Sequence, residues 1–170
     1  RHDYSRPGNQ GFPIRGIVGK DFLYLHNYKI DLWPAGNPEL GYLDVDGSPT
    51  KTQILELYRS GKDASYWQLS FGKRTTDEEF FNIANDPECL NNLANDERLS
   101  DLKRQMKTRM EDTLKEQKDP RILGNGDVFD NYGFSQEHGW NFYERFMKGE
   151  FTPKKTGWVN PSDYEPAPIE

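Results

Sequence analysis

The amino-acid sequence predicts an α+β fold, in which a small antiparallel β-sheet packs against a long C-terminal amphipathic helix. Two observations lead to this prediction. Strand-like runs at residues 12–18 and 21–28 are separated by Gly19-Lys20, a connection of hairpin length. Leucines and methionines recur at steps of three and four between residues 97 and 117, as is typical of a helix with one apolar side.

The second strand of the expected hairpin carries apolar side chains on both of its faces. Phe22 and Tyr24 lie on one face, and Leu23 and Leu25 lie on the other. Because both faces carry apolar groups, we expect this strand to be covered on both sides, at least in part.

A long connection at residues 33–49 follows, and its three prolines and three glycines predict that it lacks regular structure. Such a long loop is usually functional or packed on a partner. Ser48 and Pro49 are suited to the N-cap and the first position of a helix over residues 50–60, which Gly61 ends. The side chains that we expect to point inward from this helix are Ile54, Leu55 and Tyr58.

Two further strands are expected, at residues 67–71 (a strand or extended segment) and 79–83. Asn85-Asp86-Pro87 predicts a turn, because Asp before Pro favours extended backbone and Asn tolerates a left-handed one. Asp96 caps the long helix, and Asp119-Pro120 ends it. The apolar stripe of this helix is formed by Leu99, Leu102, Met106, Met110 and Leu114.

The composition argues against several classes of function. The net charge of −6, with no stripe of lysines and arginines, gives no reason to expect a nucleic-acid partner. No apolar run approaches the length of a membrane span, so we expect no membrane partner. The single cysteine, Cys89, cannot form a disulfide within the chain, and we interpret it as a small buried side chain.

No complete active site is evident in the residues themselves. The three histidines lie far apart and lack metal-ligand spacing, so we expect no metal site within the chain. The segment at residues 47–52 lacks the glycine that a phosphate-binding loop places before its lysine. Lys51 could nevertheless meet an anion, since it lies in the first turn of a helix, where backbone N–H groups are free.

Several short segments are more informative in their order than any one of them is alone. They are Arg1-His2, Phe12-Pro13-Ile14-Arg15 with Asp21-Phe22-Leu23-Tyr24, Asn27-Tyr28-Lys29, Trp33-Pro34-Ala35-Gly36-Asn37-Pro38, Asp46-Gly47-Ser48-Pro49-Thr50-Lys51, Phe71-Gly72-Lys73-Arg74, and Glu78 to Ala94 with its strand, N-D-P turn and N-N-L sequence. Over residues 1–130 this order resembles the C-terminal part of the sulfatase family, especially the branch similar to heparan N-sulfatase (N-sulfoglucosamine sulfohydrolase). Residues 131–170 are then an aromatic-containing extension with a proline-rich tail.

The resemblance implies both a fold and a reaction. In this family the C-terminal subdomain is a small antiparallel sheet of about four strands packed with a helix. It leans on a large α/β catalytic domain that resembles alkaline phosphatase. The family hydrolyses sulfate esters or sulfamates on sulfated glycans such as heparan sulfate, using a formylglycine made in a C/S-x-P-x-R motif and a calcium ion. It also implies a periplasmic, secreted or lysosomal location.

The chain departs from the whole enzyme in its nucleophile motif. Cys89 is followed by Leu90-Asn91-Asn92-Leu93, and Ser5-Arg6-Pro7-Gly8-Asn9 ends in Asn9 where the motif requires Arg. The acidic calcium ligands are absent as well. We therefore expect a C-terminal subdomain fragment that is inactive alone and holds no cofactor. The calcium and formylglycine belong to the catalytic domain, which is the expected partner together with the sulfated saccharide.

The resemblance also suggests substrate contacts. Arg1 and His2 lie where the family chain leaves the catalytic domain, near the active-site rim, and His2 is the first candidate for binding a sugar or sulfate oxygen. Trp33 and Lys51 are the next candidates, although Trp33 could equally pack against the catalytic domain.

Two other readings stay open. The aromatic share of 14% is compatible with a stand-alone carbohydrate-binding module. The polar tail permits a protein-interaction module.

Overall fold

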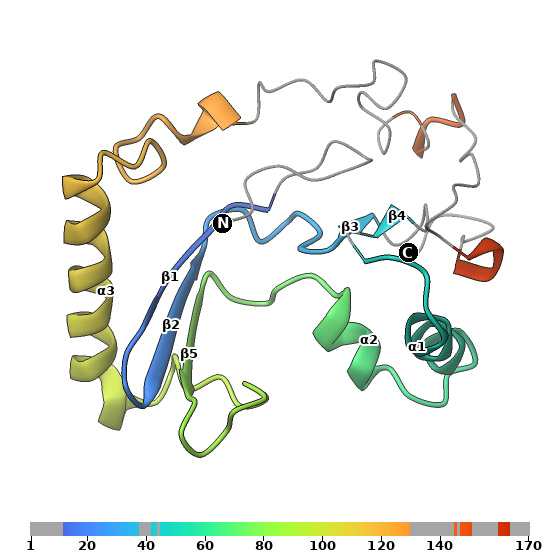
Figure 1. Cartoon of the computed structure of the whole chain (residues 1–170), viewed down its shortest axis with the longest axis horizontal. Coiled ribbons are helices and arrows are strands. Elements are labelled where there is room, and N and C mark those ends of the chain that lie inside the picture. The colour runs from blue at the N-terminus through green and yellow to red at the C-terminus, as the bar shows by residue number, and fades with distance from the viewer. Residues whose placement is uncertain are drawn as a thin grey trace. The chain divides into compact units, whose positions relative to one another are not determined.

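The computed structural model describes residues 12–37, 42–43, 45–129, 145, 147–150 and 160–163. These residues divide into two compact units (Figure 1). The described residues of the first unit are 13–30 and 75–129. Those of the second are Phe12 and the described residues between 31 and 74 and from 145 onward.

The first unit contains a three-stranded antiparallel sheet. Its strands are β1 (Ile14–Val18), β2 (Phe22–Asn27) and β5 (Glu78–Asn82), in the spatial order β1-β2-β5. The predicted hairpin between β1 and β2 is confirmed, and the N–H of Gly19 closes its turn by donating to the Phe22 carbonyl at 2.8 Å.

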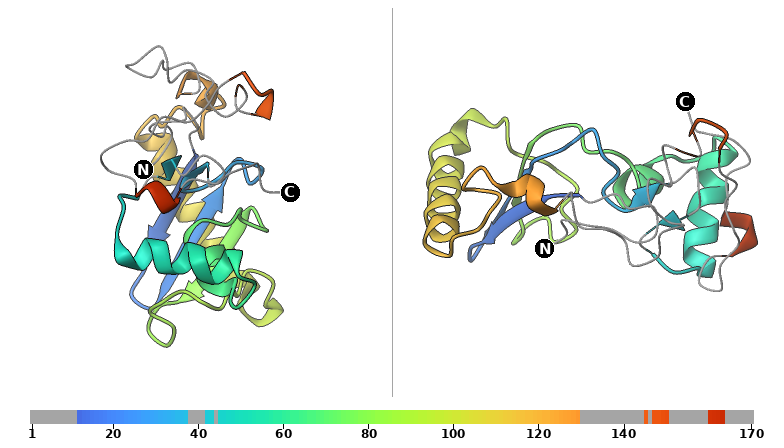
Figure 2. Two further views of the ribbon diagram at one scale, coloured as in Figure 1. Left: turned by 90° about the vertical axis from the view of Figure 1, so that its right-hand side faces the viewer. Right: turned by 90° about the horizontal axis from the view of Figure 1, so that it is seen from above.

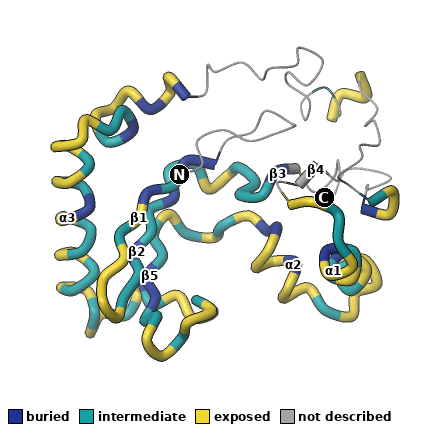
Figure 3. Tube along the Cα trace, viewed as in Figure 1, coloured by how far each residue is buried: buried dark blue, intermediate teal, exposed yellow. Residues whose placement is uncertain are grey.

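The long helix packs on one face of this sheet, as the sequence predicts. The helix α3 (Ser100–Glu116) follows a single 3₁₀ turn, η2 (Glu97–Leu99), and Figures 1 and 2 show it running alongside the strands. Partly buried and exposed positions alternate along it, and Met110 is its one buried residue (Figure 3). The buried core consists of Tyr24, Phe80, Ala94 and Met110, and the rest of the predicted stripe packs around it: Leu99, Leu102, Met106 and Leu114.

The C-terminal end of α3 forms a Schellman motif without glycine. The N–H of Asp119 donates to the Leu114 carbonyl at 2.9 Å, and the N–H of Lys118 donates to the Lys115 carbonyl at 3.0 Å. Lys118 takes the left-handed position, with φ of 55°, that this motif usually gives to glycine. The helix therefore ends where Asp119-Pro120 predicts, with some backbone strain at one lysine.

A buried ion pair joins the end of α3 to β1. The guanidinium of Arg15 donates to both carboxylate oxygens of Asp119 at 3.1 Å, and the two side chains are only 6% and 9% exposed. Asp119 also accepts the backbone N–H groups of Arg121 and Ile122. Burial raises the pKa of Asp119, but the hydrogen bonds from Arg15 and the backbone outweigh burial, so the pKa is lowered.

The second unit is built around the helix α1 (Pro49–Arg59). As predicted, Ser48 is its N-cap, and its hydroxyl accepts the Lys51 N–H at 3.1 Å. Leu55 is buried, whereas Ile54 and Tyr58 pack partly buried beside it.

The expected strand at residues 67–71 is wrong, because this segment lies in the short helix α2 (Ser65–Ser70) and the residue that follows it. Trp67 and Phe71 are both buried. Their spacing of four places them on one side of a helix, whereas the alternation of apolar and polar residues had suggested a strand. Asp63 favours the helix by accepting the Ser65 N–H at 2.8 Å.

The long loop before α1 also differs from its prediction. It contains a pair of two-residue antiparallel strands, β3 (Gly36–Asn37) and β4 (Tyr42–Leu43). Further 3₁₀ turns are η3 (Gly126–Phe129) in the first unit and η5 (Pro161–Asp163) in the second. Among the described residues, no helix is both long enough and apolar enough to cross a membrane.

Candidate functional site

Of the four residues predicted to contact substrate, the structure describes two, Trp33 and Lys51. Arg1 and His2 lie outside the described residues. Trp33 and Lys51 both belong to the second unit, but Trp33 joins an aromatic cluster and Lys51 a buried polar one.

Trp33 is half-buried in a stack of aromatic side chains. Its ring meets Trp67 edge-on, with centroids 6.2 Å apart, and Trp67 stacks on Tyr58 at 4.1 Å. The ammonium of the exposed Lys73 lies 4.8 Å from the centroid of the Trp33 ring, within the range of a cation–π interaction. The contact with Trp67 holds the Trp33 ring in place, and the Lys73 ammonium lies over that ring.

Lys51 is fully enclosed, with its side chain 1% exposed. The ammonium donates to the Val45 carbonyl at 3.0 Å and lies 3.5 Å from a carboxylate oxygen of Asp163. Burial lowers the pKa of Lys51, and the nearby Asp163 partly opposes that shift. Since Asp163 occupies the position of an anion, a sulfate oxygen could reach this ammonium only after the carboxylate had moved.

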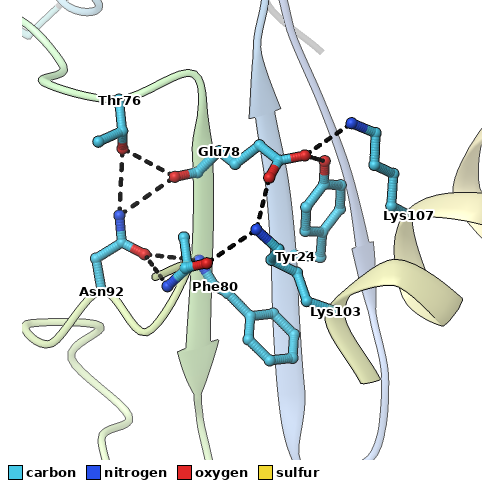
Figure 4. A network of polar contacts seen from close by, with 8 residues as sticks. Tyr24, Thr76, Glu78, Phe80, Asn92, Lys103 and Lys107 are labelled. Atoms are coloured by element: carbon cyan, nitrogen blue, oxygen red, sulfur yellow. Dashed lines mark hydrogen bonds and ion pairs between the residues drawn. The ribbon is translucent and has the colours of Figure 1, made fainter. Parts of the chain in front are cut away.

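A second polar cluster lies between the sheet and α3 in the first unit (Figure 4). The carboxylate of Glu78 on β5 accepts the Lys103 ammonium at 2.7 Å and the Lys107 ammonium at 2.8 Å. It also accepts the Tyr24 hydroxyl at 2.9 Å. Lys103 donates in addition to the carbonyl of Ala94 at 2.8 Å, so the cluster ties β2, β5 and α3 together.

The electrostatics of this cluster favour a fixed ionisation state. Burial of the Glu78 carboxylate raises its pKa, but the hydrogen bonds from Lys103, Lys107 and Tyr24 outweigh burial and lower the pKa to about 2. Burial and the same carboxylate raise the pKa of Tyr24. The hydrogen bond from Lys107 to Glu78 raises the pKa of Lys107. These shifts keep Glu78, Tyr24 and Lys107 each in one protonation state at neutral pH, which suits a structural clamp better than proton transfer.

His26 borders this cluster on β2. Its Nδ1 atom is buried without a hydrogen-bond partner among the described residues, and its ring meets Tyr28 edge-on at 4.4 Å. Burial lowers the pKa of His26, and the positive charge of Lys107 lowers it further. The imidazole is therefore held neutral beside the charged cluster.

The segment after β5 is organised by two side chains of the N-D-P and N-N-L sequences. The Asp86 carboxylate accepts the N–H groups of Leu90 at 3.1 Å and Asn91 at 2.8 Å. The Asn92 side chain accepts the Phe80 N–H at 2.9 Å (Figure 4). These contacts give the two sequence motifs a structural role.

Two predictions about this segment need correction. The left-handed residue is Cys89, with φ of 55°, and not the asparagine of the turn. Cys89 is half-buried and not fully buried, because the turn places it at the surface of the segment. Burial raises the pKa of its thiol, and the nearby carboxylate of Asp86 acts in the same direction, so the thiol is not activated as a nucleophile.

Sequence reasoning missed the partners of the two polar clusters. Glu78 and its lysines are separated by 25 and 29 residues, and Asp163 lies more than 100 residues from α1. The local pattern at Asn160-Pro161-Ser162-Asp163 does suggest a turn, but not its burial. Among the described residues, no group of three or more histidine, cysteine, aspartate or glutamate side chains could hold a metal ion.

No protein-family model matches the chain, and no curated protein matches it significantly.

Proposed function

We propose that this chain is the C-terminal subdomain of a sulfatase-like hydrolase that acts on sulfate esters or sulfamates of glycans such as heparan sulfate. The observation that carries the proposal is the order of short segments across residues 1–130, from Arg1-His2 to the N-N-L sequence. A single one of these segments would be weak support, whereas their sequence order and spacing together are specific.

The contacts of these segments support a shared framework. Arg15 in the Phe12-Pro13-Ile14-Arg15 segment forms the buried pair with Asp119. Asp86 and Asn92 in the last of them fix the backbone after β5. Residues that hold a fold together are expected to recur among proteins that share the fold, so this supports the proposed kinship without itself specifying a reaction.

In the proposed enzyme, this chain completes the fold and part of the rim of the substrate pocket. The resemblance implies that the catalytic domain supplies the formylglycine and the calcium ion. The partners are then that catalytic domain and the sulfated saccharide, in a periplasmic, secreted or lysosomal compartment.

The proposed contacts to the saccharide are His2, Arg1, Trp33 and Lys51. His2 and Arg1 would donate hydrogen bonds to sugar or sulfate oxygens, and Trp33 would offer an aromatic face. Lys51 could take part only if Asp163 were displaced from its ammonium.

The gene that encodes the chain allows a direct test of the proposed function. The reading frame upstream of Arg1 is expected to encode a C/S-x-P-x-R motif, and the encoded protein is expected to release inorganic sulfate from N-sulfated or O-sulfated glucosamine. Absence of both the motif and the activity would refute the proposal.

A point variant tests the role of the rim. In that protein, His2→Ala is expected to lower kcat/KM by about 10- to 100-fold, the value of one hydrogen bond to a charged group. His138→Ala is the matched control, because His138 lies outside the segments of the resemblance. Equal activity of the two variants would remove His2 from the site and leave the proposed reaction standing.

The second candidate is a carbohydrate-binding module, which the pairing of Trp33 with Lys73 favours. The Lys73 ammonium, which lies over the Trp33 ring, suits a negative group carried by a sugar. Micromolar binding of a heparin-derived hexasaccharide by the full chain, lost in Trp33→Ala, would support this function. Binding that survives the substitution would exclude Trp33 as the platform.

A further inference from the structure

We propose that residues 160–163, here named the clasp, are a docking element that α1 and the residues just before it recognise. In this proposal Lys51 is the anchor of the clasp. The partner is thus a segment of the chain itself, more than 100 residues away in sequence. All the contacts of the clasp described below lie within the second unit.

The central contact is charged and completely enclosed. The side chain of Asp163 is 0% exposed, and that of Lys51 is 1% exposed. One carboxylate oxygen accepts the Thr52 hydroxyl at 3.1 Å, and the other faces the Lys51 ammonium at 3.5 Å. A buried carboxylate is costly unless a cation and hydrogen-bond donors meet it, so this pocket is complementary to one acidic side chain.

The remaining contacts are to Asn160, the first residue of the clasp, and to the backbone carbonyl of Ser162. Asn160 donates its side-chain amide to the Thr52 hydroxyl oxygen at 3.1 Å, so one hydroxyl contacts both Asn160 and Asp163. Arg59 donates to the Ser162 carbonyl at 2.6 Å. Within the clasp, the Asp163 N–H donates to the Asn160 carbonyl at 2.9 Å, and this turn brings the two side chains to the same side.

Steric fit adds a third, independent kind of evidence. A β-carbon on Gly47 would lie 2.9 Å from the backbone nitrogen of Asn160 and 3.0 Å from its side-chain oxygen. Such distances are too short for ordinary contacts, so a residue other than glycine at position 47 would push the clasp away. The loop before α1 is therefore shaped for the close approach of Asn160.

In this arrangement the Lys51 ammonium is paired with a carboxylate of the same chain, that of Asp163. Two elements distant in sequence, the start of α1 and the C-terminal extension, are joined by one recognition motif, N-P-S-D. The inference goes beyond the proposed function, since it holds whatever reaction the parent protein performs.

Hydrogen exchange followed by mass spectrometry on the full chain tests the proposal. In the wild type, amides of the clasp and of the first turns of α1 are expected to be protected. Asp163→Asn keeps the shape but removes the charge, and Gly47→Ala keeps every charge but adds the clashing carbon. Both variants are expected to raise exchange in the clasp and in the first turns of α1 by at least about tenfold.

Two controls separate clasp release from general destabilisation. Asp127→Asn removes an 85% exposed carboxylate in the first unit, and Gly19→Ala adds a carbon where only ordinary contacts exist. Neither is expected to change exchange in the clasp, and protection of α3 is expected to stay unchanged in Asp163→Asn and Gly47→Ala. Wild-type exchange in the clasp at the rate of an unstructured peptide, or unchanged clasp protection in both variants, would overturn the proposal.

Discussion

The Glu78 cluster allows a quantitative prediction. Glu78→Gln keeps the size of the side chain but removes the negative charge that Lys103, Lys107 and Tyr24 all face. The amide can accept at its single oxygen, whereas its NH₂ group opposes a neighbouring ammonium. The substitution is therefore expected to destabilise the contact between α3 and the sheet.

The magnitude follows from the shift in pKa. A change from 4.5 to about 2 means that the folded state favours the ionised carboxylate by about 3 kcal/mol at neutral pH. The side chain is 19% exposed, so solvent screening reduces this figure. We expect Glu78→Gln to lower the free energy of unfolding by about 2 kcal/mol at pH 7.

Urea unfolding of the full chain at several pH values provides the assay. Because the pKa of Glu78 is depressed in the folded state, its contribution is present above pH 4.5 and is lost as the pH falls through about 2. The difference between wild type and Glu78→Gln should therefore shrink steadily below pH 4.5. Glu88→Gln, which changes an exposed glutamate, is the matched control and should alter stability by less than about 0.5 kcal/mol.

Two results would refute this reasoning. One is a Glu78→Gln protein that is as stable as the wild type at pH 7, because the cluster would then contribute nothing net to folding. The other is a difference that is the same at pH 7 and at pH 2, because it would then arise from packing and not from the charge.

Three further predictions concern the first unit. Asp119→Asn should lower the free energy of unfolding by about 3 kcal/mol, since it leaves the buried Arg15 guanidinium without its counter-charge, and chemical denaturation would measure the loss. Lys118→Gly should stabilise the chain by about 0.5–1 kcal/mol by relieving the left-handed lysine, and a fall in melting temperature would contradict this. His26 has a folded pKa below its ordinary 6.5, so its neutral form stabilises the fold above pH 6.5 and that contribution is lost as the pH falls through the folded value. His26→Gln should accordingly flatten the dependence of stability on pH between 7 and 5, and an unchanged slope would exclude His26 as its source.

The elements best predicted from the sequence are those whose signals are local. The hairpin needs only the alternation of its strands and a short turn, and α3 needs only its apolar stripe. The predicted cap, Asp96, lies at the 3₁₀ turn η2 that precedes α3, and α3 itself has no side-chain cap. Residues 67–71 were ambiguous because a spacing of four between Trp67 and Phe71 fits a helix, while alternation fits a strand. The Ser65 N–H, which donates to the Asp63 carboxylate just before the helix, favours the helix.

The polar clusters could not be predicted, because their members meet only after the chain has folded. Lys51 is a good candidate for binding an anion from its place in a helix's first turn, but its anion comes from the distant Asp163. Likewise, the lysines of α3 look like a solvated helix face until Glu78 is placed opposite two of them. Sequence patterns identify which groups need partners, whereas the fold decides which partners they find.

The outer edge of β5, the last strand in the order β1-β2-β5, has a consequence for self-association. Every outward carbonyl of this strand that the structure describes is already used: Asn92 donates to Glu78, Leu93 donates to Phe80, and the turn after the strand donates to Asn82. Strands of other molecules add to sheets through unused N–H and C=O groups, and such addition begins many aggregates. The Asn92 side chain thus occupies backbone groups of Glu78 and Phe80 at which another strand could pair, and this disfavours strand addition at this edge.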